Sequence, residues 1–241
     1  MNTILAANRL PFYVFLFFFL FSGSATALAE SPEAVASRLQ SRYDKIQSLS
    51  FDFIQDTRGQ LSGRPKRGRG QAFFVKIPTA SKTSDKIQSG KMRWNYSSPD
   101  RQVLVSDGKT FSMYFSSLEQ MIITPAEALQ QDLTYSFFTG SGILVEDFTI
   151  LPPDQSSATT QDKTAVIKLV PKAKQSQVAS IHLWVTDNSL IRRIEMLDHF
   201  DTLTVLNFSS LKVNTLDADD GALMEKLFNF TPPEGTEIIH Q

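Results

Sequence analysis

The stretch from Lys91 to Thr124 limits the folds open to this chain more than any other part of it. Its first strand alternates large side chains with polar ones, as a half-buried strand does: Met92, Trp94 and Tyr96. Turns are predicted at 97–100, which contains a proline, and at 106–109, where Asp-Gly is a strong hairpin signal. Four short strands follow from this pattern, so the stretch predicts an antiparallel sheet with a large, soft apolar surface.

The first 29 residues have the pattern of a secretory signal peptide. Arg9 is their only charge, an apolar run extends from Phe12 to Phe21, and Ala27-Leu28-Ala29 matches a small-x-small cleavage site. An uncleaved membrane anchor is the alternative, but the run covers only about half of the roughly 20 apolar residues that a span needs. We therefore expect residues 1–29 to be removed and residues 30–241 to form one domain in a bacterial periplasm.

Composition excludes several classes of protein. The chain has no cysteine, which excludes a disulfide framework, a thiolate metal site and a lipid-modified cysteine after the signal peptide. Its formal net charge is −1, so no overall basicity points to nucleic acid as a partner.

The rest of the chain predicts an α+β fold. An N-terminal helix begins at Ser31-Pro32-Glu33, because serine caps a helix and proline suits its first position. Further helical segments are expected at 125–131, within 132–142 and, as irregular or helical chain, at 213–225. Besides the four strands above, strands are expected at 49–55, 71–77, 144–151, 164–170, 178–186, 190–197, 202–208 and 228–233. An antiparallel sheet of about ten or eleven strands tends to curl into a barrel or half-barrel.

Two polar segments are expected to be loops. Residues 58–70 carry five basic side chains, which suit either an anionic partner or lipid headgroup, or an ordinary solvated loop: Arg58, Arg64, Lys66, Arg67 and Arg69. Residues 78–90 read as a surface excursion or flap.

The sequence contains no arrangement of residues typical of catalysis. Nucleophile elbows, phosphate-binding loops and dinucleotide motifs are all missing, so we expect neither an enzyme nor a cofactor. The residues at 198–201 and 217–221 contain aspartates, but turns and a helix start explain them better than a metal site does.

The aromatic and aliphatic load of the early strands points instead to an apolar cavity, although an ordinary core would have a similar composition. Methionine and phenylalanine suit flexible, non-directional ligands. The side chains expected to line the cavity are Leu49, Phe51, Phe53, Phe73, Val75, Met92, Trp94, Val103, Val105, Phe111 and Met113. Those expected to form a lid over it are Leu39, Tyr43, Phe137 and Phe138.

Several motifs along the chain resemble those of the LolA family, the periplasmic carriers of outer-membrane lipoproteins. The motifs are Ser41-Arg42-Tyr43-Asp44-Lys45-Ile46, Phe51-x-Phe53-x-Gln55, Phe74-Val75-Lys76-x-Pro78, Arg93-Trp94, Pro99, residues 103–110, Leu169-x-Pro171-Lys172 and Phe228-x-Phe230-Thr231-Pro232-Pro233-x-Gly235. The Val-Ser-Asp-Gly-Lys-Thr run at 105–110 and the C-terminal motif are specific as a pair.

The resemblance implies an incomplete, half-open antiparallel barrel covered by a lid of short helices, with acyl chains bound inside. It also implies a monomer whose partners are acylated lipoproteins, an inner-membrane lipoprotein-releasing ABC transporter (LolCDE-like) and an outer-membrane receptor (LolB-like). Two alternatives remain open at this point: a carrier of another lipid, such as a glycolipid or phospholipid, and a non-carrier sensor domain of the same fold.

The chain departs from the family pattern at one position. The family commonly has Lys-Arg-Pro where this chain has Lys76-Ile77-Pro78, and that arginine is thought to bond the lid shut. Lid closure is therefore expected to rest on apolar contacts or on another polar group.

Overall fold

A computed structural model describes residues 30–59, 64–77, 90–131, 135, 137–138, 142–154, 164–173 and 177–241. The expected signal peptide and residues 78–89 of the expected flap lie outside the described residues. Within the described part, no helix is long and apolar enough to span a membrane.

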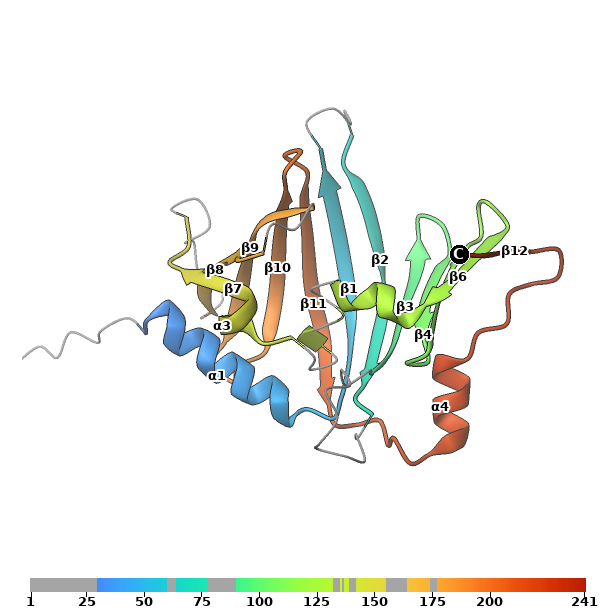
Figure 1. Ribbon diagram of the computed structural model, residues 1–241, viewed down its shortest axis with the longest axis horizontal. Coiled ribbons are helices and arrows are strands. Elements are labelled where there is room, and N and C mark those ends of the chain that lie inside the picture. Colours follow the sequence, from blue (N-terminus) through green and yellow to red (C-terminus); the bar gives the residue numbers. More distant parts are fainter. Residues whose placement is uncertain are drawn as a thin grey trace, which may run out of the picture.

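One sheet of twelve strands organises the molecule, in the order β12-β6-β5-β4-β3-β2-β1-β11-β10-β9-β8-β7. Its strands are β1 (Ser48–Arg58), β2 (Lys66–Val75), β3 (Lys91–Ser98), β4 (Gln102–Ser106), β5 (Thr110–Phe115), β6 (Gln120–Pro125), β7 (Phe148–Leu151), β8 (Thr164–Pro171), β9 (Val178–Thr186), β10 (Ile191–Asp198), β11 (Leu203–Val213) and β12 (Glu237–His240). Neighbouring strands are antiparallel except β12 and β6, which are parallel. The strands at the two ends of this order, β7 and β12, do not pair with each other. The sheet is therefore a half-barrel that does not close (Figure 1).

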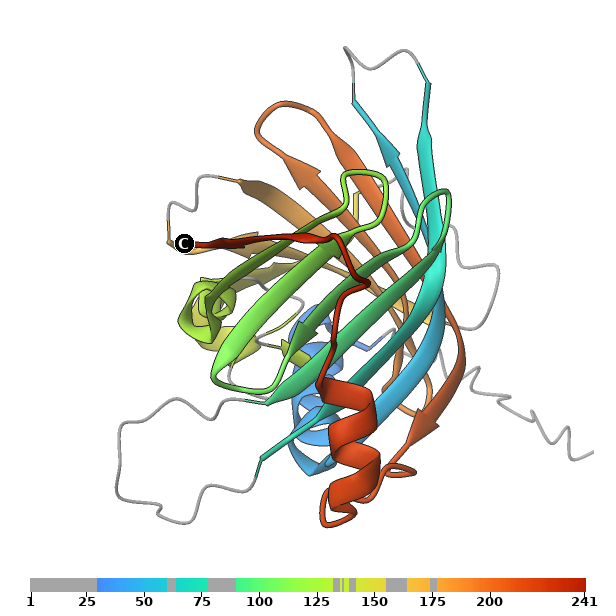
Figure 2. The same ribbon diagram turned by 90° about the vertical axis from the view of Figure 1, so that its right-hand side faces the viewer.

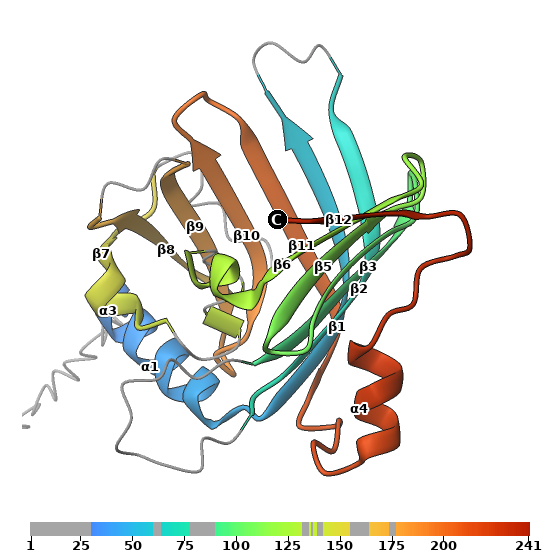
Figure 3. The same cartoon turned by 45° about the vertical axis from the view of Figure 1, so that its right-hand side comes forward.

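Of the helical elements whose bounds the structure describes, three lie on the concave side of the sheet, which curls around them (Figure 2). They are α1 (Pro32–Lys45), the 3-10 helix η1 (Ala126–Gln131) and α3 (Leu144–Asp147). A fourth helix, α4 (Gly221–Phe228), lies against the opposite, convex side (Figure 3).

The start of α1 follows the sequence expectation. Ser31 is the N-cap, and its side chain accepts a hydrogen bond from the backbone N–H of Ala34 at 3.2 Å. The apolar stripe of the helix is buried against the sheet, with Leu39 and Tyr43 each at most 2% exposed. The helix is amphipathic, and its burial under the half-barrel gives it most of its stability.

The two faces of the sheet carry two separate hydrophobic clusters. The concave cluster is the larger, and the register places Phe51, Ala72, Trp94 and Leu104 in one cross-strand row on that face. The convex cluster lies beneath α4 and contains Val75, Val103, Val105, Tyr114, Met121, Met224 and Phe228. Successive side chains of a strand point to opposite faces, so the two clusters interleave along β2 to β5.

Four strands and their turns between Lys91 and Pro125 confirm the hairpin series expected there. In the turn before β5, the Asp107 carboxylate accepts hydrogen bonds from the backbone N–H groups of Lys109 and Thr110, both at 2.8 Å. Burial raises the pKa of Asp107, but the hydrogen bonds to its carboxylate together lower it below its usual value. Gly108 has φ 94°, a conformation that glycine adopts without steric cost.

The expectation of a loop at 58–70 is wrong for its second half. β1 continues to Arg58 and β2 begins at Lys66, so four of the five basic residues lie on a strand. Residues 66–70 consist of basic residues and glycines. They have no apolar side chain, so the alternation that identifies a strand was not present in the sequence. Gly70 is needed there, because a Cβ would lie 1.8 Å from the carbonyl oxygen of Asn95 on β3.

Two other expected strands differ from the structure: the one at 144–151 is right only for its second half, β7, and the one at 228–233 is wrong. Residues 144–147 form α3 before the strand begins at Phe148, because polar groups cap this helix: the Asp147 carboxylate accepts from Ile143 N–H at 3.0 Å. The predicted final strand at 228–233 is instead the end of α4 and extended chain, and the last strand is β12. Phe228 and Phe230 alternate as in a strand, but Phe228 is the last residue of a helix buried on the convex face.

Candidate functional site

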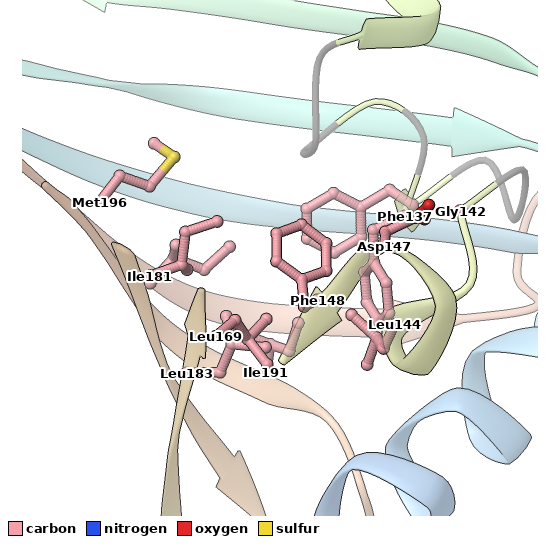
Figure 4. A pocket seen from close by; sticks show the side chains of 12 residues that line it. Phe137, Gly142, Leu144, Asp147, Phe148, Leu169, Ile181, Leu183, Ile191 and Met196 are labelled. Atoms are coloured by element: carbon pink, nitrogen blue, oxygen red, sulfur yellow. The ribbon is translucent and has the colours of Figure 1, made fainter. Parts of the chain in front are cut away.

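An apolar pocket lies between the concave face of β7–β10 and the helical lid. Its empty volume is about 480 Å³ when the open mouth is included. The lining side chains are almost all hydrocarbon (Figure 4): Phe137, Phe138, Gly142, Leu144, Asp147, Phe148, Leu169, Ile181, Leu183, Ile191, Ile194 and Met196. The chemistry of this lining suits a flexible apolar ligand.

An aromatic cluster separates the pocket from the middle of the sheet. Phe138 contacts Phe51, Phe74 and Phe208, with ring centroids 5.5, 4.9 and 6.0 Å apart. Phe137 packs on Tyr43 of α1 at 4.5 Å. The two lid phenylalanines therefore join the pocket wall to the core, and their rings would have to shift for a ligand to extend further under the lid.

Polar contacts fasten the middle of α1 to the β7–β10 side of the sheet. The Arg38 guanidinium donates to the carbonyl oxygen of Thr186 at 2.8 Å and to the Ser189 hydroxyl at 3.0 Å. Gln40 accepts from the backbone N–H of Leu144 at 3.0 Å, which connects α1 to α3. Both contacts hold the helix across the rim of the pocket.

The C-terminal end of α1 is fastened through Tyr43 and Lys76. The backbone N–H of Ile191 on β10 donates to the Tyr43 hydroxyl at 3.2 Å, and burial raises the pKa of this phenol. From the other side, the Lys76 ammonium donates to the carbonyl oxygens of Tyr43 at 2.6 Å and Asp44 at 3.4 Å. Burial lowers the pKa of Lys76, while the nearby Asp44 carboxylate raises it.

Lys76 thus supplies a polar contact to the lid beside the position where the family arginine is missing. Its side chain is only 6% exposed, and the unpaired carbonyl groups at a helix C-terminus favour a cation. Lid closure was expected to rest on apolar contacts or on another polar group, and Lys76 supplies a contact of the second kind.

The structure divides the predicted cavity residues between two faces. Leu49, Phe51, Phe53, Met92, Trp94, Phe111 and Met113 belong to the concave cluster or pack against it, with the lid residues Leu39, Tyr43, Phe137 and Phe138. Phe73, Val75, Val103 and Val105 belong to the convex cluster beneath α4, so they do not share a face with the others. Of the fifteen predicted residues, Phe137 and Phe138 line the pocket itself.

The pocket strands β8, β9 and β10 were recognised in the sequence, but their side chains were not assigned to the site. Leu169, Ile181 and Met196 form one cross-strand row on the concave face. Their alternation with polar neighbours, as in Ile181-His182-Leu183, was the available signal.

The outer face of the same strands carries a charged cluster. Asp154 lies 2.9 Å from the Lys168 ammonium and 3.3 Å from Nε2 of His182, the latter without hydrogen-bond geometry. His182 lies on the outer face as its position in the strand indicates, but it is buried, not solvent-exposed, and burial lowers its pKa. Lys168 and His182 in turn lower the pKa of the Asp154 carboxyl.

The remaining aspartate clusters serve turns and caps. Asp198 accepts from the backbone N–H groups of Phe200 and Thr202, and Asp220 caps α4 by accepting from Leu223 N–H at 2.9 Å. Among the residues that the structure describes, no group of histidine and carboxylate side chains could hold a metal ion.

Comparison with known proteins adds independent information. The family model for the outer membrane lipoprotein carrier protein LolA matches residues 44–231. The outer-membrane lipoprotein carrier protein of Methylococcus capsulatus is 31% identical over 218 residues, which are 90% of this chain and 91% of the relative. That of Nitrosomonas europaea is 30% identical over 69% of this chain and 75% of its own.

Solved structures show more distant likenesses. A LolA superfamily protein from Nitrosomonas europaea has a TM-score of 0.39 at 14% identity, covering 84% of this chain and 99% of that one. The Mycobacterium tuberculosis lipoprotein LppX has a TM-score of 0.42 at 11% identity, covering 78% and 98%. The sequence match over most of the chain settles the classification: the protein belongs to the LolA family of outer membrane lipoprotein carrier proteins.

Proposed function

We propose that this protein is a periplasmic chaperone that carries acylated lipoproteins from the inner to the outer membrane. The observation that carries the proposal is the apolar pocket between the lid and β7–β10, in a chain of the LolA family. The pocket is lined mainly by hydrocarbon side chains and has few polar groups that could orient a ligand. Such a site suits binding of acyl chains and not chemistry upon them.

The energetics of acyl transport favour a pocket whose side chains can rearrange. Each buried CH₂ contributes about 0.8 kcal/mol, so one 16-carbon chain represents roughly 12 kcal/mol that must be kept from water. A carrier must match most of this free energy and still release its cargo. Phe137 and Phe138, whose ring centroids are 5.8 Å apart, and the flexible Met196 provide a lining that cargo can rearrange.

The proposal includes the partners that such a cycle needs. An inner-membrane lipoprotein-releasing ABC transporter would supply the energy for loading, and an outer-membrane receptor of similar fold would accept the cargo. The pocket and its lid are complete within one chain, which is consistent with a monomer.

Mass spectrometry of the purified protein tests the cargo. Bound acyl-modified protein supports a lipoprotein carrier, whereas free glycolipid or phospholipid would replace it with a carrier of another lipid. A protein that stays empty and does not bind a fluorescent fatty acid would refute both. Incubation with inner-membrane vesicles that contain the transporter should then release lipoproteins into solution.

The position of the pocket can be tested with a matched pair of substitutions. Met196→Trp fills the pocket between β9 and β10, so fatty-acid binding should fall at least tenfold. Met113→Trp places the same ring on β5, on the concave face but outside the pocket lining, and should bind as the wild type does. The reverse result would move the acyl site to the β3–β5 half of the sheet, where the sequence first suggested it.

A further inference from the structure

The β1–β2 hairpin carries a concentration of positive charge that the carrier proposal does not use. Residues 52–71 contain five basic and two acidic side chains, a net charge of +3. Elsewhere the chain has 19 basic and 23 acidic residues, a net charge of −4. The charges of the protein are therefore segregated, with the excess of cations on one hairpin.

These cations are exposed and mostly unpaired. Arg58, Arg64, Lys66, Arg67 and Arg69 are all solvent-exposed. Within the described residues their one ion pair joins Arg67 to Asp56 at 3.7 Å, and the Arg67 side chain is still 68% exposed. An exposed pair of this length stabilises the fold little, so the cations are not held there by intramolecular ion pairs.

The cations lie on both faces of the hairpin. The register places Lys66 opposite Thr57 on the concave face, and Arg67 opposite Asp56 on the convex face together with Arg69 and Arg58. Pairing of β2 with β3 begins only at Arg69, so the hairpin projects beyond β3 (Figure 1). A protein partner would meet one face of such a hairpin, whereas a layer of phosphate headgroups can contact both faces.

The hairpin also lies near the pocket. Met196 in the pocket wall pairs with Thr204, and Thr204 pairs with Thr57, the residue before Arg58. Two strand spacings of about 4.8 Å each separate Met196 from Thr57, so the pocket wall is roughly 10 Å from the base of the hairpin. Contact of the hairpin with a surface would bring this end of the pocket close to that surface.

We propose that the β1–β2 hairpin binds the anionic phospholipid headgroups of a bilayer and orients the pocket toward the membrane. Arginine is suited to phosphate through its paired N–H donors, and four of the five cations are arginines. The proposal rests on the carrier function, because a protein that collects or delivers acyl chains must approach a membrane.

Co-flotation of the purified protein with vesicles tests this binding. Vesicles of phosphatidylglycerol and phosphatidylethanolamine should bind the wild type, with binding that falls as salt rises, and phosphatidylcholine vesicles should not. The variant Arg64→Gln/Arg67→Gln/Arg69→Gln should lose about fivefold in partitioning per charge, or roughly 100-fold in total. The matched control Lys109→Gln/Arg192→Gln/Lys226→Gln removes three exposed cations elsewhere and should bind nearly as the wild type does.

Three results would overturn the proposal: equal binding to both vesicle compositions, no binding to either, or equal losses in the two triple variants. Binding of a fluorescent fatty acid, measured on the same samples, distinguishes this failure from failure of the carrier function. The hairpin variant should retain fatty-acid binding and thermal stability while its vesicle binding is lost. A wild type that binds vesicles but no fatty acid would refute the carrier function and leave the membrane contact standing.

Discussion

Replacement of Lys76 by methionine should loosen the C-terminal end of α1. Methionine keeps the length and the apolar stem of the side chain but removes the ammonium that donates to the Tyr43 and Asp44 carbonyl groups. Hydrogen bonds from a charged donor contribute about 1.5–3 kcal/mol, and a cation at a helix C-terminus adds about 0.3–1 kcal/mol. The cost of burying the ammonium, which lowers its pKa, offsets part of this gain.

We expect a net loss of about 2 kcal/mol in the free energy of unfolding for Lys76→Met. For a domain of this size, such a loss lowers Tm by roughly 4–8 °C. Urea denaturation monitored by tryptophan fluorescence measures the loss, and hydrogen exchange should show it first as lower protection within α1.

Lys45→Met is the matched control for this substitution. Lys45 is exposed in the last turn of the same helix, so its replacement should change stability by no more than about 0.5 kcal/mol. If the two variants unfold at the same urea concentration, the hydrogen bonds of Lys76 do not hold the lid, and the reasoning fails.

Two further predictions concern Tyr43 of the lid and His182 on the outer face of β9. Tyr43→Phe removes the acceptor of the buried Ile191 N–H and should cost about 1–3 kcal/mol in urea denaturation, while Tyr114→Phe, on the convex face away from the lid, should cost less. Because burial lowers the pKa of His182 below about 6.5, the unfolded chain binds more protons near pH 6, so stability should rise with pH from 5 to 7. Asp154, Lys168 and Glu195 surround this imidazole, and in His182→Gln the rise should be smaller; an unchanged pH profile would show that His182 is not its source.

The strand pattern of this fold could be predicted because half-barrel strands alternate in hydrophobicity. β9 was predicted with its observed bounds, and the four strands after Lys91 lie where their turns indicated. The parallel strand β12 could not be predicted, because its four residues have no alternation and pair with β6 across more than a hundred residues of chain. Likewise, α3 depends on a hydrogen bond from its own Leu144 N–H to Gln40 of α1, a contact that local propensity does not contain.

The error in the candidate site has one physical cause, which is that β2 to β5 are covered on both faces. Phe73 and Phe74 are adjacent and both apolar, and in such a strand alternation does not tell which set faces the cavity. The choice depends on α4, which covers Val75, Val103 and Val105 from the convex side and comes more than a hundred residues later. Arg93 of β3 lies on the same convex side. Its guanidinium donates to the Leu227 carbonyl oxygen near the end of α4 at 2.8 Å. On β8–β10, the polar residues Lys168, His182 and Glu195 form one cross-strand row on the outer face, and this row indicates that their apolar neighbours point inward. The pocket lies against these strands, so the polar row on β8–β10 was a better guide to the site than the aromatic side chains of β1–β5.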